Sequence, residues 1–351
     1  MEFALSEEQE ELARTVRGML AKRADSGAVR AASTSATGHD PALWQTLCEQ
    51  IGAVALGIPE EYDGAGFTLF ETLVVLEELG RALAPSPLLA SLLAAEALLA
   101  TDSPDADLLG RLAAGETGTV VDARGTATAA PSGDAGWELS GSARSVLDGD
   151  RAEVVLVIAD GPTTPVLLAV DPGAVEATWV PTMDQALRVA DLAFGATAAR
   201  LLAGDATTVL ERIAQVGAAA TSALQVGVAA RALEMTVDYT KVRHQFGRPI
   251  GSFQALKHRM ADMLVLVEMA RSASWAASYA VAHRTEDAAR LARVAKAYCG
   301  DALDHVAGET VQLHGGIAIT WEHDAHLVFK RAHALGQLYG TAAEHRAALL
   351  G

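Results

Sequence analysis

The amino-acid sequence predicts a mostly α-helical protein with a small β domain in the middle of the chain. Apolar residues recur at helical spacing near the start and again after residue 206, which is typical of amphipathic helices packed on a core. In between, short β-branched runs alternate with glycine, proline and aspartate, which is typical of strands and turns. We therefore expect an N-terminal helical domain (1–116), a middle β domain (117–200) and a C-terminal four-helix bundle (201–351).

The composition excludes several classes of function. Of the 351 residues half are apolar and 5% are aromatic, and Lys plus Arg total 27 against 44 Asp plus Glu, a formal net charge of −17. Such an acidic chain is not expected to bind nucleic acid or an anionic membrane nonspecifically. The acidic start lacks a signal sequence and no apolar run suggests a membrane span, while Cys48 and Cys299 form no disulfide or metal pattern. We expect a soluble, cytoplasmic protein.

The N-terminal part begins with a helix that a capping box should start. Ser6 and Gln9 have the spacing of such a box, and Leu12, Val16 and Leu20 follow at helical spacing. Residues 25–40 are rich in small polar residues and are expected to form a loop. Further helices are expected at residues 41–49, 70–82 and 88–99, with a turn-rich link at residues 51–66.

The middle part contains three clear strand signals. Residues 154–158 and 166–170 are apolar runs bounded by turn residues, and residues 137–141 alternate as a half-buried strand does. After residue 206 the pattern becomes helical again, and three long stripes of apolar residues indicate three long antiparallel helices and a shorter fourth. These stripes indicate the core of the bundle.

A sharp turn interrupts the long helices of the last part. It has the pattern R-x-x-F-G-x-P-I, from Arg243 through Phe246 to Ile250, and proline cannot continue a helix. An arginine at this place suits a phosphate, because its planar fork donates two parallel hydrogen bonds. The alternative is an ordinary helix end, with Arg243 at the helix dipole and Phe246 in the core.

A second motif, Q-x-x-G-G, closes the next long helix. Gln312 can both donate and accept hydrogen bonds, and Gly315 and Gly316 have no Cβ to keep a ligand away from the backbone. The alternative is that the two glycines merely stop the helix. A few residues later His323 and His326 have metal-ligand spacing, but no third histidine or cysteine lies nearby, and we assign no metal site.

Together these two motifs resemble the flavin-binding corner of the acyl-CoA dehydrogenase family. The turn PEEYDGAG (59–66), the helix end EELGRA (77–82) and the segment T-W-E-H-D-x-H (320–326) also resemble family members, the last a bacterial branch. The resemblance implies the family's fold, an acyl-CoA thioester substrate and an electron-transfer flavoprotein as acceptor. It also implies FAD binding across a subunit interface by six residues: Arg243, Gln245, Phe246, Gln312, Gly315 and Gly316.

The middle domain departs from the family pattern. The family has a T-E-P-x-A-G-S-D segment and a W-I-T turn that flank the flavin ring, and this chain has residues 121–126 and 145–149 instead. The tryptophan and the hydroxyl donor are both missing, and Asp148 adds an anion. The resemblance therefore implies that a flavin held by this subunit's own β domain would lose its main contacts.

The catalytic base of the family is also missing. Tyr339 stands where the family's glutamate would be, and Gly217 occupies the alternative position upstream. An unperturbed tyrosine titrates near ~10 and is a poor base at neutral pH. Glu211 and Glu344 lie a few residues from these two positions and remain alternatives. We assign no catalytic residue to the chain.

Three functions remain open. The first is a subunit of a flavin-dependent acyl-CoA dehydrogenase that forms an α,β-unsaturated acyl-CoA, paired with a paralogous catalytic subunit as a heterotetramer with two copies of each. A bulky or steroid-derived substrate follows from the resemblance to heteromeric bacterial members. The second is a self-sufficient homo-oligomeric dehydrogenase with an unrecognised base. The third is a flavin-free interaction protein on the same scaffold.

Overall fold

The computed structural model describes residues 4–133 and 136–350. It divides the chain into two compact units, each assembled from separate segments. Unit 1 contains residues 1–30, 73–84 and 218–351, and unit 2 contains residues 31–72 and 85–217. The division of the chain at residues 116 and 200 stays a prediction, since neither unit follows those boundaries, and residues 1–3 of the first predicted domain lie outside the described residues.

Local sequence signals predict the first helix correctly but miss the second. Helix α1 (Glu7–Arg23) begins with the predicted capping box, in which the Ser6 hydroxyl accepts from the Gln9 N–H at 3.3 Å and the Gln9 side chain accepts from the Ser6 N–H at 3.0 Å. The prediction of a loop at residues 25–40 was wrong in its first half, where α2 (Ser26–Ser33) forms. A carboxylate oxygen of Asp25 accepts from the Ala28 N–H at 2.8 Å and so caps this helix.

Unit 2 contains the helices α3 (Pro41–Thr46), α5 (Leu88–Leu99) and α6 (Ala106–Ala113) and the seven strands of the predicted β domain. Helix α5 packs on the first strand, where the Ser91 hydroxyl accepts from the Gly118 N–H at 3.0 Å. The strands are β1 (Gly118–Asp122), β2 (Ala127–Ser132), β3 (Gly136–Leu147), β4 (Val154–Asp160), β5 (Pro165–Val170), β6 (Glu176–Val180) and β7 (Val189–Ala203).

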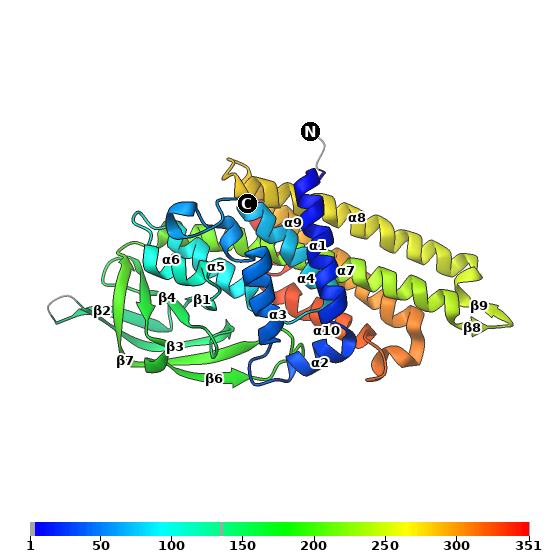
Figure 1. The fold of residues 1–351 in the computed structure, drawn as a ribbon, viewed down its shortest axis with the longest axis horizontal. Helices are drawn as coiled ribbons and strands as arrows, with labels where there is room; N and C mark the ends of the chain where they lie inside the picture. Colours follow the sequence, from blue (N-terminus) through cyan, green and yellow to red (C-terminus); the bar gives the residue numbers. More distant parts are fainter. Residues whose placement is uncertain (1–3, 134–135, 351) are drawn as a thin grey trace. The chain divides into compact units, whose positions relative to one another are not determined.

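The strand pairings of unit 2 close a ring. Strand β4 pairs with β2 and β5, β2 with β3, and both β3 and β5 with β7, while β1 and β6 extend the sheet from β4 and β7 (Figure 1). Alternate residues of the central strands point into one apolar core that includes Leu139, Val157 and Leu168. The ring closes between β2 and β4 at a single residue pair, Thr128 with Asp160, so most of the described part of β2 is paired on one side only.

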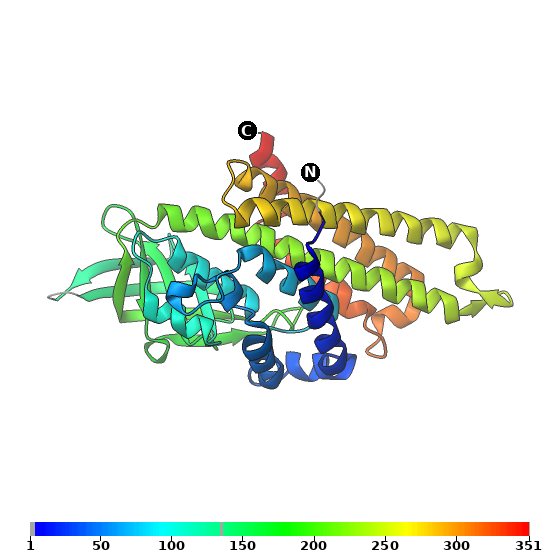
Figure 2. The same cartoon turned by 45° about the horizontal axis from the view of Figure 1, so that its top comes forward.

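Unit 1 contains the C-terminal helices (Figures 1 and 2). Helices α7 (Thr207–Val242), α8 (Gln254–Ala282) and α9 (Ala288–His314) are long, and α8 and α9 lie side by side. Two shorter helices, α10 (Ala325–Gln337) and α11 (Ala342–Leu350), pack against α9. The three long helices and a shorter fourth agree with the prediction, and α11 is an addition to it. Helix α4 (Leu69–Ala82) contributes its last ten residues to this unit.

Small residues let α4 and α7 approach closely. A Cβ added at Gly227 would collide with the carbonyl oxygen of Glu77, and one added at Gly80 would collide with that of Leu224. Helix α7 is also long and apolar enough to span a membrane by length and composition, contrary to the expectation that no stretch reaches that length. However, 83% of its most apolar window is buried inside the protein, as in a core helix.

Candidate functional site

The R-x-x-F-G turn forms a tight β-hairpin at the end of α7. Strands β8 (His244–Gln245) and β9 (Arg248–Pro249) pair in antiparallel fashion. Phe246 and Gly247 have φ of 54° and 76°, and two positive φ angles in succession define the turn that best suits a two-residue hairpin loop. The hairpin is anchored to the helix, because the Arg243 carbonyl accepts from the Ile250 N–H at 2.7 Å.

The hairpin presents its side chains to solvent. Phe246 is 92% exposed, so the alternative in which it belongs to the core is wrong. The Arg248 guanidinium lies over the ring of Phe253, 4.0 Å from its centroid, and is thus engaged within the hairpin. The Arg243 side chain is exposed and has no hydrogen bond or ion pair with any residue between 4 and 133 or between 136 and 350. Arg243 is therefore a free cation at the surface.

The Q-x-x-G-G motif ends α9 in a conformation that requires glycine. Gly315 has φ 63° and ψ −145°, a combination that is essentially confined to glycine. A Cβ added at Gly315 or Gly316 would meet no atom within 4 Å. A side chain at Gly316 would therefore not collide with the rest of the chain. Its absence leaves room for an external group to approach the backbone closely. Gln312 is exposed beside them.

The two motifs meet at one end of the helices of unit 1. Tyr239, one turn before Arg243, stacks on His314 of the second motif, with ring centroids 4.4 Å apart and planes at 26°. One turn earlier on each helix, the Thr236 hydroxyl donates to that of Thr310 at 3.0 Å. Residues 243–249 and 312–316, which we call the corner, therefore follow helix ends that lie side by side, although some seventy residues separate them in sequence.

Two stretches of the β domain, residues 121–126 and 145–149, differ from the resembled family pattern. Their polar groups form hydrogen bonds within the β domain. The Asp122 carboxylate accepts from the Arg124 guanidinium at 2.7 and 2.8 Å, and the Thr126 hydroxyl donates to the carbonyl of Ala123 at 3.0 Å. In the second stretch the Ser145 N–H donates to Asp191 at 3.0 Å. These groups fit poorly as donors to a flavin ring, in contrast to the free groups of the corner.

Asp148 does not behave as the simple anion that the sequence predicts. It follows β3 in a left-handed conformation, with φ 51°. Burial, and next the charge of Asp150, raise the pKa of Asp148 to about 7, although Arg188 opposes the shift. Arg188 itself is held by Asp150, whose carboxylate accepts at 2.6 and 2.9 Å. The Asp148 carboxyl is therefore partly protonated at neutral pH.

This raised pKa predicts a pH-dependent gain in stability from Asp148→Asn. The carboxyl titrates near ~3.9 in the unfolded chain and near 7 when folded, so folding stability falls as pH rises from about 4 to 7 and then stays level. The amide never charges, and asparagine tolerates positive φ. We expect the assembled protein to gain on the order of 2 kcal/mol at pH 8 and little at pH 4.5. Thermal midpoints at the two pH values measure this.

Asp150→Asn is the matched control, because it removes the partner of Arg188 and should lower the midpoint at pH 8. An equal gain from Asp148→Asn at both pH values would show that the carboxyl does not titrate in this range.

The turn at Tyr339 contains no group suited to act as a base. Burial raises the pKa of Tyr339, so its phenol stays protonated at neutral pH. The carbonyl of Tyr339 accepts from His345 Nε2 at 2.7 Å, and that of Gly340 accepts from the Lys296 ammonium at 2.8 Å. Lys296 is fully buried on α9, and burial lowers its pKa to about 8. The sequence analysis missed this lysine, which stands beside Ala295 in the apolar stripe.

The two alternative carboxylates lie in different surroundings. The Glu344 carboxylate accepts from the backbone N–H and the hydroxyl of Thr341, at 2.8 and 2.9 Å. These hydrogen bonds, the backbone one first, lower the pKa of Glu344, which is the wrong direction for a base at neutral pH. Glu211 is exposed on α7, in the part of that helix that belongs to unit 2.

Comparison with known proteins decides the family. The profile of the acyl-CoA dehydrogenase N-terminal domain matches residues 6–116, and that of the acyl-CoA dehydrogenase C-terminal domain matches residues 207–350. The chain belongs to the acyl-CoA dehydrogenase family.

Individual relatives cover almost the whole chain. It is 44% identical to acyl-CoA dehydrogenase IpdE2 of Mycolicibacterium smegmatis over 97% of both chains, and 44% identical to IpdE2 of Mycobacterium tuberculosis over 95% of this chain and 93% of that one. Among solved structures it resembles the Tcur3481–Tcur3483 steroid ACAD variant, with 32% identity, a TM-score of 0.88 and coverage of 98% and 96%. It also resembles the ChsE4–ChsE5 complex of Mycobacterium tuberculosis, with 28% identity, a TM-score of 0.90 and coverage of 99% and 98%.

Membership of the family makes FAD the ligand with which the corner should be compared. Acyl-CoA dehydrogenases depend on FAD, and the corner offers the features that a dinucleotide needs: a free arginine, an exposed amide, an exposed ring and a glycine pair with open space before it. Such a ligand would lie on the surface of the chain, because the side chains that would contact it are exposed: Arg243, Gln245, Phe246 and Gln312. The corner thus fits the cofactor, whereas the β-domain stretches do not.

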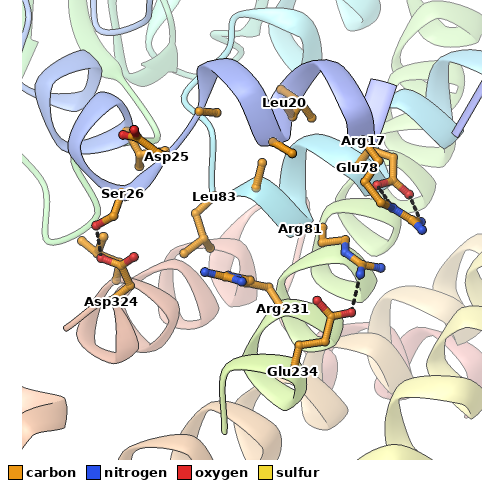
Figure 3. Close-up of a pocket in the computed structure, with 15 residues that line it drawn as sticks. Arg17, Leu20, Asp25, Ser26, Glu78, Arg81, Leu83, Arg231, Glu234 and Asp324 are labelled. Atoms are coloured by element: carbon orange, nitrogen blue, oxygen red, sulfur yellow. Dashed lines mark hydrogen bonds and ion pairs between the residues drawn. The ribbon is translucent and has the colours of Figure 1, made fainter. Parts of the chain in front are cut away.

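Unit 1 also contains a cavity that the sequence analysis did not predict (Figure 3). It has a volume of about 330 Å³ and lies between α1, α4 and α7. Arg17 pairs with Glu78 at 2.6 Å and Arg81 with Glu234 at 2.5 Å, whereas Arg231 extends below Leu83 without a hydrogen bond in the described parts of the chain. Asp25 and Asp324 also line the cavity, so its four acidic residues outnumber its three arginines and it shows no preference for an anion.

The described residues contain no group of three histidine, cysteine or acidic side chains that could hold a metal ion. His326 instead packs edge-on against Trp321, with ring centroids 4.6 Å apart, and His323 joins the ring contacts at the corner.

Proposed function

We propose that this chain is the cofactor-completing subunit of a heteromeric, flavin-dependent acyl-CoA dehydrogenase. Bound FAD would supply the acceptor for a hydride from Cβ of the acyl-CoA while a base takes the proton from Cα, and the product would be an α,β-unsaturated acyl-CoA. This chain binds the FAD pyrophosphate and adenosine across the interface with Arg243, Gln245, Phe246, Gln312, Gly315 and Gly316. A paralogous subunit supplies the base and the seat of the flavin ring.

The observation that carries this proposal is the contrast between the two halves of a flavin site within one chain. The corner groups that would act on a neighbour's flavin are exposed and free, as with Arg243. The groups that would serve the chain's own flavin are engaged elsewhere, as with Thr126, or of the wrong chemistry, as with Tyr339. A chain that formed a complete flavin site by itself would need both the corner groups and the groups that contact the flavin ring and act as the base.

The solved relatives support a heteromeric assembly and a bulky substrate. One is the complex of ChsE4 with ChsE5, and the other, Tcur3481–Tcur3483, is described as a steroid ACAD. By analogy we propose a heterotetramer with two copies of each subunit and a bulky acyl substrate such as a steroid-derived thioester. We further propose a cytoplasmic location and reoxidation by an electron-transfer flavoprotein.

Tyr339→Phe tests the absence of a base in this chain. We expect kcat/KM of the assembled complex to stay within a few fold of the wild type, because a phenol whose pKa is raised cannot take a proton at neutral pH. Glu344→Gln and Glu211→Gln test the two remaining carboxylates and should behave in the same way. A loss of several hundred-fold in any of the three variants, with the flavin content unchanged, would place the base in this chain and disprove the proposed division of labour.

A further inference from the structure

Three aromatic rings contact one another pairwise beneath the corner and form a cluster that we call the stack. His314 lies 4.4 Å from Tyr239, nearly parallel to it, and 4.4 Å from the tilted ring of His323, between ring centroids. Tyr239 and His323 also meet edge-on at 5.9 Å. His314 is 3% exposed, so its ring is closed off from solvent. The stack joins the end of α7, the end of α9 and the segment that leads into α10.

The hydrogen-bond surroundings of the two imidazoles favour their neutral forms. Nδ1 of His314 donates to the carbonyl of Thr310 at 2.7 Å, because a carbonyl can only accept. Its Nε2 is buried and has no hydrogen-bond partner among the described residues, so a proton added there would find no acceptor. Nδ1 of His323 accepts from the N–H of Ala325 at 3.2 Å, which is impossible once that nitrogen is protonated.

Burial also opposes protonation of the stack. It lowers the pKa of His314, although the hydrogen bond to the Thr310 carbonyl opposes the shift, and the neighbouring His323 adds to it. Burial lowers the pKa of His323 as well, and among its neighbours Arg231 of α7 and Arg30 of α2 act in the same direction while Asp324 opposes them. From α10, His326 faces the same group of charges, and burial lowers its pKa too.

The stack is placed to set the geometry of both flavin motifs. The Tyr239 carbonyl accepts from the Arg243 N–H at 2.9 Å, and His314 lies between Gln312 and Gly315 in the chain. We propose that the neutral Tyr239–His314–His323 stack is a positioning element that holds the two motifs in register for FAD, and that protonation of its histidines loosens the corner and releases the cofactor. This inference rests on the proposed function, since it assumes that the corner binds FAD.

The test is the release of flavin from the assembled complex between pH 8 and pH 4.5, followed by the fluorescence of the freed flavin. The wild type should release it with a midpoint below about pH 6.5. His314→Phe keeps a ring in the stack but cannot be protonated, and the double variant with His323→Phe removes both titrating groups. We expect the midpoint to fall by at least half a pH unit in the single variant and further in the double variant.

The chain offers a matched control at another place on the bundle. Tyr279 and His283 stack at 4.1 Å, and Nδ1 of His283 bonds to the Tyr279 carbonyl at 2.9 Å, but both side chains are exposed and distant in sequence from the motifs. His283→Phe should leave the midpoint unchanged. An equal shift in this variant, or an unchanged midpoint in the double variant of the stack, would overturn the inference.

Tyr239 provides a second test that does not depend on the histidine variants. Tyr239→Phe keeps the ring and should bind flavin as the wild type does, whereas Tyr239→Leu should raise the Kd about 3- to 10-fold at pH 8. Equal Kd values for the two variants would overturn the positioning role. A wild-type complex that binds no flavin at pH 8 would instead overturn the proposed function, which the pH midpoints alone do not address.

Discussion

Co-expression with its paralogous subunit is expected to give a yellow, active complex, whereas the chain alone should be colourless or insoluble. Alone, the chain can build only homomeric sites that combine a good corner with a poor seat for the flavin ring. Under the proposed function, the Asp122–Arg124 pair and Asp148 stand where the resembled family pattern has donors to the ring. Exposed apolar side chains near the corner, such as Phe246 and Ile319, would also remain uncovered, which favours aggregation.

The measurement is flavin absorbance per mass of assembly, with the mass obtained from light scattering. We expect one flavin for each pair of unlike subunits and close to none for the chain alone. The paralogue expressed alone is the necessary control, because a paralogue with full flavin and activity would show that this chain is dispensable. A stable homo-oligomer of this chain that carries one flavin per subunit and is reduced by an acyl-CoA would disprove the heteromeric assembly.

Arg243→Ala should weaken flavin binding in the assembled complex by about 10- to 150-fold. This range corresponds to the loss of a charge-assisted contact worth roughly 1.5–3 kcal/mol. The fold should tolerate the change, because the side chain is exposed and its hairpin is held by backbone bonds such as that from the Ile250 N–H to the Arg243 carbonyl. Titration of the flavin-free complex with FAD measures the Kd directly.

Two further variants separate charge from geometry at this place. Arg243→Lys keeps the charge but loses the planar fork, so its Kd should lie between those of the wild type and Arg243→Ala. Arg248→Ala removes a guanidinium from the same hairpin, but one that is engaged with Phe253, and should have a much smaller effect. If Arg243→Ala and the wild type bind FAD equally well, Arg243 is not the phosphate ligand.

The features that the sequence predicted correctly depend on residues close together in the chain. The Ser6–Gln9 capping box, the helix at residues 88–99 and the strands at residues 154–158 and 166–170 all form as predicted. Capping, apolar periodicity and turn residues act over a few positions, so they can be read from the sequence directly. Family resemblance then supplied the connection between the two motifs, which no local pattern contains.

The errors arose where the local signal was weak or the outcome depended on distant residues. Helix α2 contains a single large apolar side chain, Val29, and its capping by Asp25 was overlooked in a segment rich in small residues. The residue type of Phe246 is compatible with a core position, and only the hairpin geometry shows that the side chain is exposed. The charge of Asp148 depends on burial and on Asp150 and Arg188, which the fold brings together.

The sequence by itself therefore determined the class of fold and the family, whereas the flavin role of the two motifs and the lack of a base stay predictions. Only the tertiary structure decided which groups are available to a ligand. Arg243 is free while Arg248 is engaged, Lys296 is buried against the turn at Gly340, and Tyr239 and His314 stack although 75 positions separate them. Residue types and spacings fix local conformation, but exposure, pairing and pKa depend on neighbours that come together only when the helices pack.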